Sequence, residues 1–141
     1  MKPSHALAAL LVLPLAIGEG EVQISTPAGP FATFHHGEGD RVPFLWPVLG
    51  PGGVEVTRAF PMEEGRSGES SDHPHHTSLW FAHGDVNGND FWHDRDGARI
   101  SPAGKAEVTE EDGAVRVASR HRWVTGKDVE LLEEARTMTF R

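Results

Sequence analysis

The stretch AEVTEEDGAVRVASRHRWV, residues 106–124, decides the fold class. Its second half alternates strictly between two faces, as a β-strand with one buried side does. One face carries Val115, Val117, Ser119, His121 and Trp123, and the other carries Arg116, Ala118, Arg120 and Arg122. The turn residues Glu111-Asp112-Gly113 precede this strand. We therefore predict a β-hairpin with arms at 105–110 and 113–124.

Short alternating or apolar runs, separated by turn residues, extend this pattern along the chain. Further strands are predicted at 21–25, 31–34, 54–60 and 77–83. The run 41–49 contains Pro43 and Pro47, which predicts an edge strand or an extended segment. Residues 129–141 begin with helix formers, but the alternation in their second half favours a strand. We expect an all-β protein built as an antiparallel β-sandwich.

The composition excludes several classes of protein. A chain of 141 residues fits one domain, and its 16 glycines and 10 prolines suit many turns. The net charge is −8 and no basic stripe is present, so a nucleic-acid partner is not expected. There are no cysteines, which excludes disulfides, thiolate metal sites and a cysteine nucleophile. A metal site would have to use histidine and carboxylate ligands.

The N-terminus, MKPSHALAALLVLPLAIGEG, has the pattern of a secretory signal peptide. Lys2 supplies a positive charge, an apolar stretch of 12 residues follows, and the small residue Gly18 precedes the expected cleavage point. The stretch is too short for an ordinary membrane-spanning helix. We predict a signal peptide at 1–18 and a secreted or periplasmic β domain at 19–141, with no membrane partner after cleavage.

The chain ends at Arg141, inside the last predicted strand, without a turn or a cap. The β domain is therefore expected to be truncated at its C-terminus, with only the N-terminal part of the sandwich present. A partial sandwich exposes unpaired edges and an apolar face, so we expect this chain to be poorly stable alone. Cooperative thermal unfolding without aggregation would contradict that expectation.

The segment GESSDHPHHTSLWFAHGDVNGNDFWHD, residues 68–94, concentrates the titratable groups of the chain. Five of the nine histidines lie in it, namely His73, His75, His76, His83 and His93. Histidine titrates near neutral pH and can act as a general acid, a general base or a metal ligand. A neighbouring carboxylate fixes the tautomer of an imidazole and raises its basicity. This composition makes the segment the candidate functional site.

The local geometry of this segment is predicted from its prolines and glycines. Pro74 biases the preceding residue toward an extended shape, so His73 and His75 should share one face. His76 would then point the other way. The glycines at positions 84 and 88 allow tight turns, which are expected to bring His83 and its neighbours back toward the same place.

Three interpretations of these side chains stay open. The first is a solvated polar loop without special function. The second is an acid–base site, with catalytic residues His73, His75, His83, Asp72 and Asp85. The third is a divalent metal site, with ligands His75, His76, His83 and Asp85. The spacing matches neither the HExxH pattern nor a known three-histidine motif, so the metal site is the weakest prediction.

Four more residues are candidates for binding a substrate. Trp80 and Trp92 suit either a protein core or stacking on the apolar face of a sugar ring. Arg58 suits either a carboxylate or phosphate anchor or a structural ion pair. Asn87, in the polar turn, completes the predicted substrate-binding set.

Three segments, 43–62, 68–92 and 131–140, resemble the PmoA-like family of secreted bacterial proteins labelled "methane oxygenase PmoA". The resemblance is strongest in the DHPHH, LWFAHGDVNG and FW motifs and covers most of the chain. It implies an all-β fold akin to the galactose mutarotase-like sandwich and an occurrence beside sugar-degrading domains. Methane oxidation is not implied, because the methane monooxygenase component of that name is an integral membrane protein.

Together these observations predict an exported, carbohydrate-active protein with a histidine–aspartate acid–base site, acting as an epimerase, a lyase or a hydrolase. One alternative is a metal-dependent, oxygenase-like enzyme, as the family label implies. Another is a non-catalytic sugar-binding module. The expected partner is a small molecule or a carbohydrate. The cofactor does not follow from the sequence, and a divalent metal is the one candidate. Neither the substrate nor the oligomeric state follows from the sequence.

Overall fold

Alternating apolar residues and glycine-rich turns place much of the chain in antiparallel β-strands. The computed structural model describes residues 17–141. Its first sheet has the strand order β1-β2-β3-β4-β5. The bounds are Ile17–Gly18 for β1, Glu21–Thr26 for β2, Gly29–His35 for β3, Phe44–Val48 for β4 and Leu79–Trp80 for β5. A short 3-10 turn, η1 (Pro51–Gly53), follows β4.

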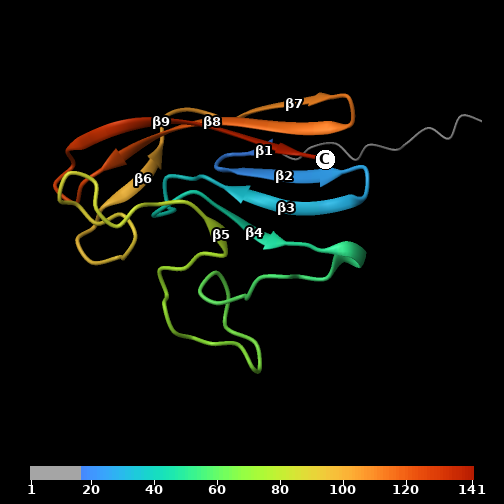
Figure 1. The fold of residues 1–141 in the computed structure, drawn as a ribbon, viewed down its shortest axis with the longest axis horizontal. Helices are drawn as coiled ribbons and strands as arrows, with labels where there is room; N and C mark the ends of the chain where they lie inside the picture. Colours follow the sequence, from blue (N-terminus) through green and yellow to red (C-terminus); the bar gives the residue numbers. More distant parts are fainter. Residues whose placement is uncertain (1–16) are drawn as a thin grey trace, which may run out of the picture.

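The second sheet is organised around β8 (Ala114–Val124). One edge of β8 pairs with β9 (Glu130–Phe140) over nearly its whole length. The other edge pairs with β7 (Glu107–Glu111) and, further along, with β6 (Arg99–Pro102). All pairings are antiparallel, and the two sheets lie one above the other in Figure 1. The predicted hairpin and the predicted final strand are both confirmed.

The two sheets pack through a shared hydrophobic core, which confirms the predicted antiparallel sandwich. Phe34, Ile24 and Val22 from the first sheet meet Val115 and Val117 of β8. Each of these five side chains is buried. A second cluster around Phe91 and Trp123 fills the end of the molecule where β6 lies. The alternation read from residues 114–124 is therefore what places β8 over the first sheet.

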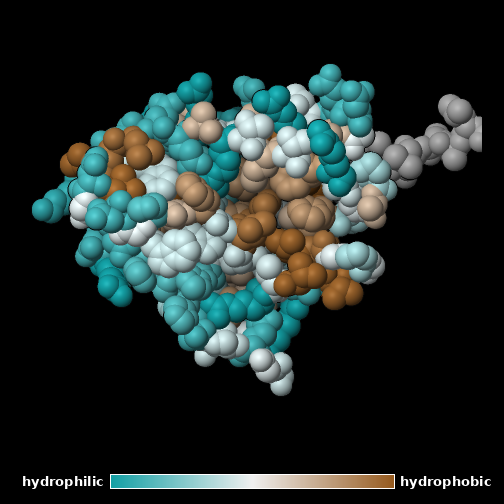
Figure 2. Space-filling view, in the orientation of Figure 1, coloured by the Kyte–Doolittle hydropathy of each residue, from teal (hydrophilic) through white to brown (hydrophobic). Residues whose placement is uncertain are grey.

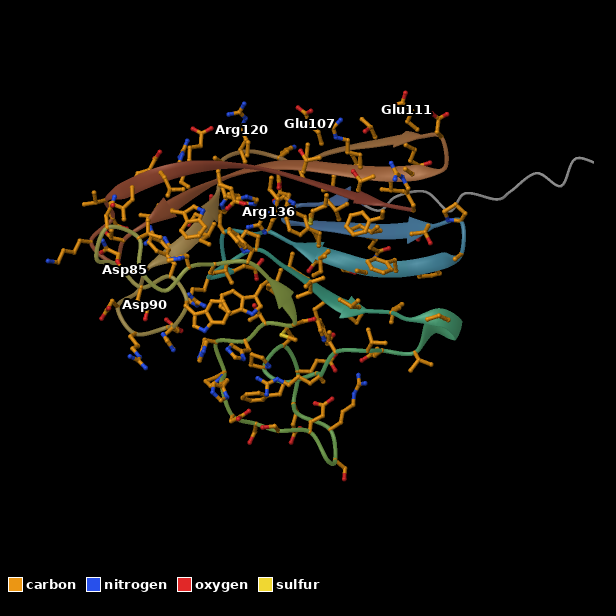
Figure 3. The ribbon with its side chains drawn as sticks, in the orientation of Figure 1. Asp85, Asp90, Glu107, Glu111, Arg120 and Arg136 are labelled. Atoms are coloured by element: carbon orange, nitrogen blue, oxygen red, sulfur yellow. The ribbon has the colours of Figure 1, made fainter. Side chains whose placement is uncertain are left out.

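The inner face of the β8–β9 pair is polar in its middle. Ser119 is the register partner of Arg136, and His121 is the partner of Glu134. Figure 3 shows Arg136 pointing between the sheets, while Arg120 points outward. Two polar rungs thus interrupt an otherwise apolar face of the second sheet.

The strand predicted at 54–60 is wrong. Within the described residues this segment forms only an isolated bridge. Val54 and Val56 are 64% and 62% exposed, so their alternation is not matched to a buried face. The backbone N–H of Ala59 is bonded by the carboxylate of Glu69 instead of by a neighbouring strand. A side chain thus satisfies the backbone group that a ladder would have satisfied.

Two other boundaries differ from the sequence prediction. The strand predicted at 77–83 shrinks to β5, because the chain pairs with β4 only at Leu79 and Trp80. The run 41–49 forms β4, which lies between β3 and β5 and is therefore not the edge strand that its prolines suggested. Pro47 lies beyond the two residues that pair with β5. Strand β6 was missed because Arg99–Pro102 is too short to show a period.

The predicted signal peptide, 1–18, lies outside the described residues except for Ile17 and Gly18, which form β1. In the part of the chain from residue 17 onward, no helix has the length and apolarity needed to cross a membrane.

Candidate functional site

The loop that contains the predicted site is turned rather than extended. The backbone N–H of His76 donates to the carbonyl of His73 at 3.0 Å, and His73 has φ 49°, in the left-handed region. The extended His-Pro-His geometry predicted from Pro74 is therefore wrong. Histidine tolerates this region better than most residues, and such backbone is often found at functional sites.

Because of this turn, four imidazoles gather on one surface, which we call the imidazole cluster: His73, His75, His76 and His93. The ring centroids of His73 and His76 lie 5.0 Å apart, and those of His75 and His76 lie 4.4 Å apart. His93, from the following loop, lies 4.9 Å from His75. His76 thus joins His73 and His75, whereas an extended segment would have turned it away.

Two members of the cluster are paired with carboxylates. Nδ1 of His73 lies 2.8 Å from Oδ2 of Asp72, and Nδ1 of His93 lies 2.8 Å from Oδ2 of Asp90. A carboxylate at Nδ1 holds the proton on that nitrogen and leaves Nε2 as the basic atom. A hydrogen bond from Ser70 and the contact with His73 lower the pKa of Asp72 to about 2. Asp72 therefore stays ionised and keeps its imidazole oriented at neutral pH.

The two remaining imidazoles are held neutral. Burial lowers the pKa of His75 and of His76 below the ordinary value of 6.5, and repulsion from the neighbouring imidazoles adds to it. Nε2 of His75 is buried and has no hydrogen-bond partner among the described residues. Neutral imidazoles at pH 7 can accept a proton, so the cluster combines oriented and proton-accepting rings.

Two tryptophans border the imidazole cluster. Trp80 of β5 and Trp92 lie 4.6 Å apart by ring centroid, and His76 lies 6.0 Å and 5.7 Å from them. Arg41 donates to the carbonyl oxygens of Phe91 and Trp92 and stands 5.8 Å over the Trp80 ring. Trp92 is 37% exposed. Trp80 packs partly against the second core cluster, whereas Trp92 is the more exposed of the two indoles.

Arg58 holds the backbone of residues 70–73, which leads into the imidazole cluster. Its guanidinium donates to the carbonyl oxygens of Ser70, Asp72 and His73 and to the carboxylate of Asp72. The contacts support the structural ion pair, the alternative to a substrate anchor. Glu69 adds a second clamp, because its carboxylate accepts backbone N–H groups of Ala59 and Phe60.

Replacing Arg58 with methionine is expected to loosen residues 70–76 without unfolding the sandwich. The carbonyl groups that Arg58 holds would lose their donors, and one charge-assisted bond is worth roughly 1.5–3 kcal/mol. Hydrogen exchange should show faster exchange at the amide of His76 and unchanged exchange in β8. Arg116→Met, on the outer face of β8, serves as the control. Equal exchange at His76 in both variants would contradict the clamp.

The remaining predicted residues form a turn beside the second loop, where the carbonyl oxygen of His83 accepts from the N–H of Phe91. His83 bonds through Nδ1 to the backbone of Asp85, and Asp85 accepts from the N–H of Gly88. Asn87, at φ 52°, sits with Gly88 in the tight turn between Val86 and Asn89. In the structure His83, Asp85 and Asn87 build this turn and make no ring contact with the cluster.

The predicted metal site is not assembled. His75 and His76 belong to the imidazole cluster, whereas His83 and Asp85 belong to the tight turn. Over residues 17–141, no group of three or more histidine or carboxylate side chains has the arrangement to hold a metal ion. The predicted ligand set therefore has no geometric support.

Three residues of the site have no role in the sets assigned from the sequence: Arg41, and Asp90 and His93, which lie in the candidate segment. Asp90 also accepts the backbone N–H groups of Trp92 and His93, which folds the second loop toward the cluster. The Asp-x-x-His spacing was the available signal for this pair. Arg41 lies far away in the sequence, and nothing near it marks the contact.

Comparison with known proteins defines a family. The model of a family of unknown function, DUF6807, matches residues 21–141. This chain belongs to that family. No curated protein and no solved structure matches, so the expected likeness to galactose mutarotase stays a prediction. The match to DUF6807 covers β2 through β9 and both loops of the imidazole cluster, but its description names no activity.

Proposed function

We propose that this DUF6807 protein acts on a carbohydrate by acid–base catalysis at the imidazole cluster. The observation that carries the proposal is the convergence of four imidazoles and two indoles from two separate loops. Ordering these side chains costs conformational entropy, which a solvated loop without function has no need to offset. Export of the protein and its kinship to PmoA-like proteins belong to the same proposal.

The acid–base role rests on the two histidine–aspartate pairs and the rings between them. The carboxylates of Asp72 and Asp90 orient the imidazoles of His73 and His93. The ring centroid of His75 lies 5.7 Å from that of His73 and 4.9 Å from that of His93. One ring can take a proton from a sugar while another returns one. Epimerisation, elimination and hydrolysis all need such a pair.

The carbohydrate as substrate rests on the indoles. Trp92 presents a partly exposed ring beside hydrogen-bonding imidazoles. A sugar has apolar C–H faces and a polar rim, so it suits a surface with an aromatic face and polar edges. Trp80, which contacts both Trp92 and His76, would extend that face.

The test is calorimetric titration with a panel of neutral and acidic sugars, followed by assays for conversion of each sugar that binds. Trp92→Ala is expected to weaken binding roughly tenfold, since it removes the stacking face. His75→Asn is expected to keep binding and to lower turnover by roughly a hundredfold or more. Trp46→Phe, on β4, is the matched control and should change neither quantity.

The outcomes separate the proposal from its alternatives. If no sugar in the panel binds, the proposal fails. Binding without any conversion, with unchanged affinity when His73 and His75 are replaced by alanine, would leave only a sugar-binding module. In that case Trp80→Ala should still abolish binding.

A further inference from the structure

A cavity of about 530 Å³ opens between the edge of the first sheet at β4–β5 and the edge of the second sheet at β9. Its walls are mainly aromatic and aliphatic, with Phe34, Phe44 and Leu79 on one side and Met138 and Phe140 on the other. Figure 2 shows an apolar hollow in the middle of this face. Leu79 is 53% exposed, although the hydrophobic effect disfavours such exposure.

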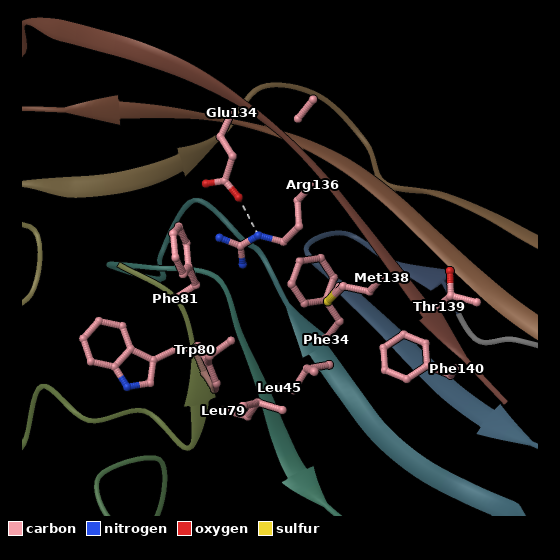
Figure 4. Close-up of a pocket in the computed structure, with 12 residues that line it drawn as sticks. Phe34, Leu45, Leu79, Trp80, Phe81, Glu134, Arg136, Met138, Thr139 and Phe140 are labelled. Atoms are coloured by element: carbon pink, nitrogen blue, oxygen red, sulfur yellow. Dashed lines mark hydrogen bonds and ion pairs between the residues drawn. The ribbon is translucent and has the colours of Figure 1, made fainter. Parts of the chain in front are cut away.

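One end of this cavity is polar. Nε of Arg136 donates to Oε1 of Glu134 at 2.6 Å, and Oε2 of Glu134 accepts from the indole N–H of Trp123 at 2.8 Å. Figure 4 shows the Arg136 guanidinium between Glu134 and the ring of Phe81, which lies 5.9 Å from it. The ion pair neutralises the charge of both groups at this end.

The polar end has one spare hydrogen-bond donor, and further unpartnered polar atoms lie on the neighbouring strand β8. Nη2 of Arg136 is buried and has no partner among the described residues, and the same holds for Oγ of Ser119, its register partner. Both ring nitrogens of His121, beside them on β8, also lack partners. Of these residues only Arg136 lines the cavity. Buried polar atoms are nearly always bonded, so the orphaned Nη2 of Arg136 points to a missing acceptor.

We propose that this cavity binds a neutral, ring-containing and mainly apolar molecule that carries one hydrogen-bond acceptor, at a site that shares only the wall residue Trp80 with the surroundings of the imidazole cluster. The volume lies in the range of small-molecule sites, roughly 300–1,000 Å³. A free sugar does not fit these walls, because their polar groups are confined to one end. A carboxylate does not fit that end, because Glu134 already neutralises Arg136 and would repel it.

The experiment titrates the chain with methyl naphthyl ketone, naphthalene and naphthoate, followed by calorimetry. The ketone has the ring and the neutral acceptor, naphthalene lacks the acceptor, and naphthoate carries a charge. We expect saturable binding of the ketone at one site, with naphthalene and naphthoate about tenfold weaker, since one hydrogen bond contributes at that scale.

Three variants locate the site. Phe81→Ala removes a wall that is 60% exposed, so folding should be little affected, and ketone binding should weaken about tenfold. Met138→Trp fills the cavity from β9 and should abolish binding. Thr137→Val, on the outward face of β9, is the control and should bind as the parent does.

The proposal is overturned if the parent shows no saturable binding of the ketone. Equal affinity of the ketone and naphthalene would overturn the assignment of the polar end. Unchanged binding in Phe81→Ala would place the ligand elsewhere and also overturn the proposal, whether or not Met138→Trp folds. Sugar binding at the imidazole cluster is a separate readout, and its failure leaves this test intact.

Discussion

Replacing Glu134 with alanine is expected to lower the free energy of unfolding by about 3–5 kcal/mol, the cost of leaving one partner of a buried ion pair alone. The side chains of Glu134 and Arg136 are 16% and 13% exposed. Burial raises the pKa of Glu134, but hydrogen bonds from Arg136 and Trp123 outweigh it and lower the pKa below its usual value. The variant would strand the guanidinium and the indole N–H between the sheets. Urea unfolding of both proteins measures the difference.

The neighbouring residue supplies the control. Glu133 is also on β9 and pairs with Arg120, but that pair is exposed on the outer face. Glu133→Ala should change stability by no more than about 1 kcal/mol, as exposed pairs do. The double variant Glu134→Leu with Arg136→Met should regain most of the loss, because no buried charge is left unpaired. Equal losses from Glu133→Ala and Glu134→Ala would contradict this account.

Acid should destabilise the protein through His121. Burial lowers the pKa of His121 from 6.5 to about 4, and Arg136 contributes in the same direction against Glu134. The folded state therefore resists a proton that the unfolded state accepts below pH 6.5. The contribution of neutral His121 to the free energy of unfolding is complete above pH 6.5. It falls by about 3 kcal/mol as the pH drops from 6.5 to 4. Burial also lowers the pKa of His36, whose ring contacts Phe34 as that of His121 does, so His36 acts in the same direction.

Unfolding free energies measured by denaturant titration at pH values of about 7, 6, 5 and 4 give the slope of stability against pH. His121→Leu should remove most of the slope between pH 6.5 and 4, whereas His83→Leu, at an exposed position, should leave it in place. Matching pH profiles for the parent and His121→Leu would contradict the assignment.

The sequence predicted the second sheet well because its strands are long and regular. The alternation at 114–124 identified the buried face of β8, and that face is buried as predicted. The prediction failed for short segments, because they contain too few residues to show a reliable alternation. Strand β6 is too short to show a period, and the alternating segment 54–60 forms only an isolated bridge to Leu49.

The imidazole cluster was predicted in composition but not in geometry. Residue types located His73 and His75, but the expected extended shape failed because the His73 backbone adopts a left-handed turn. A one-residue rule for proline cannot anticipate such a turn, since the hydrogen bonds from Arg58 hold it in place. His83 makes no ring contact with the cluster, because its side chain bonds to the backbone of Asp85 instead.

The proposal that the imidazole cluster binds and transforms a sugar is tested most directly by side-chain NMR of the imidazole nitrogens during a sugar titration. We predict that the signals of His73, His75, His76 and His93 shift together and saturate at one affinity. His35 and His121, which lie elsewhere in the sandwich, should not move. No shift at the four cluster histidines with any sugar in the panel would contradict the proposal, as would shifts confined to the other histidines.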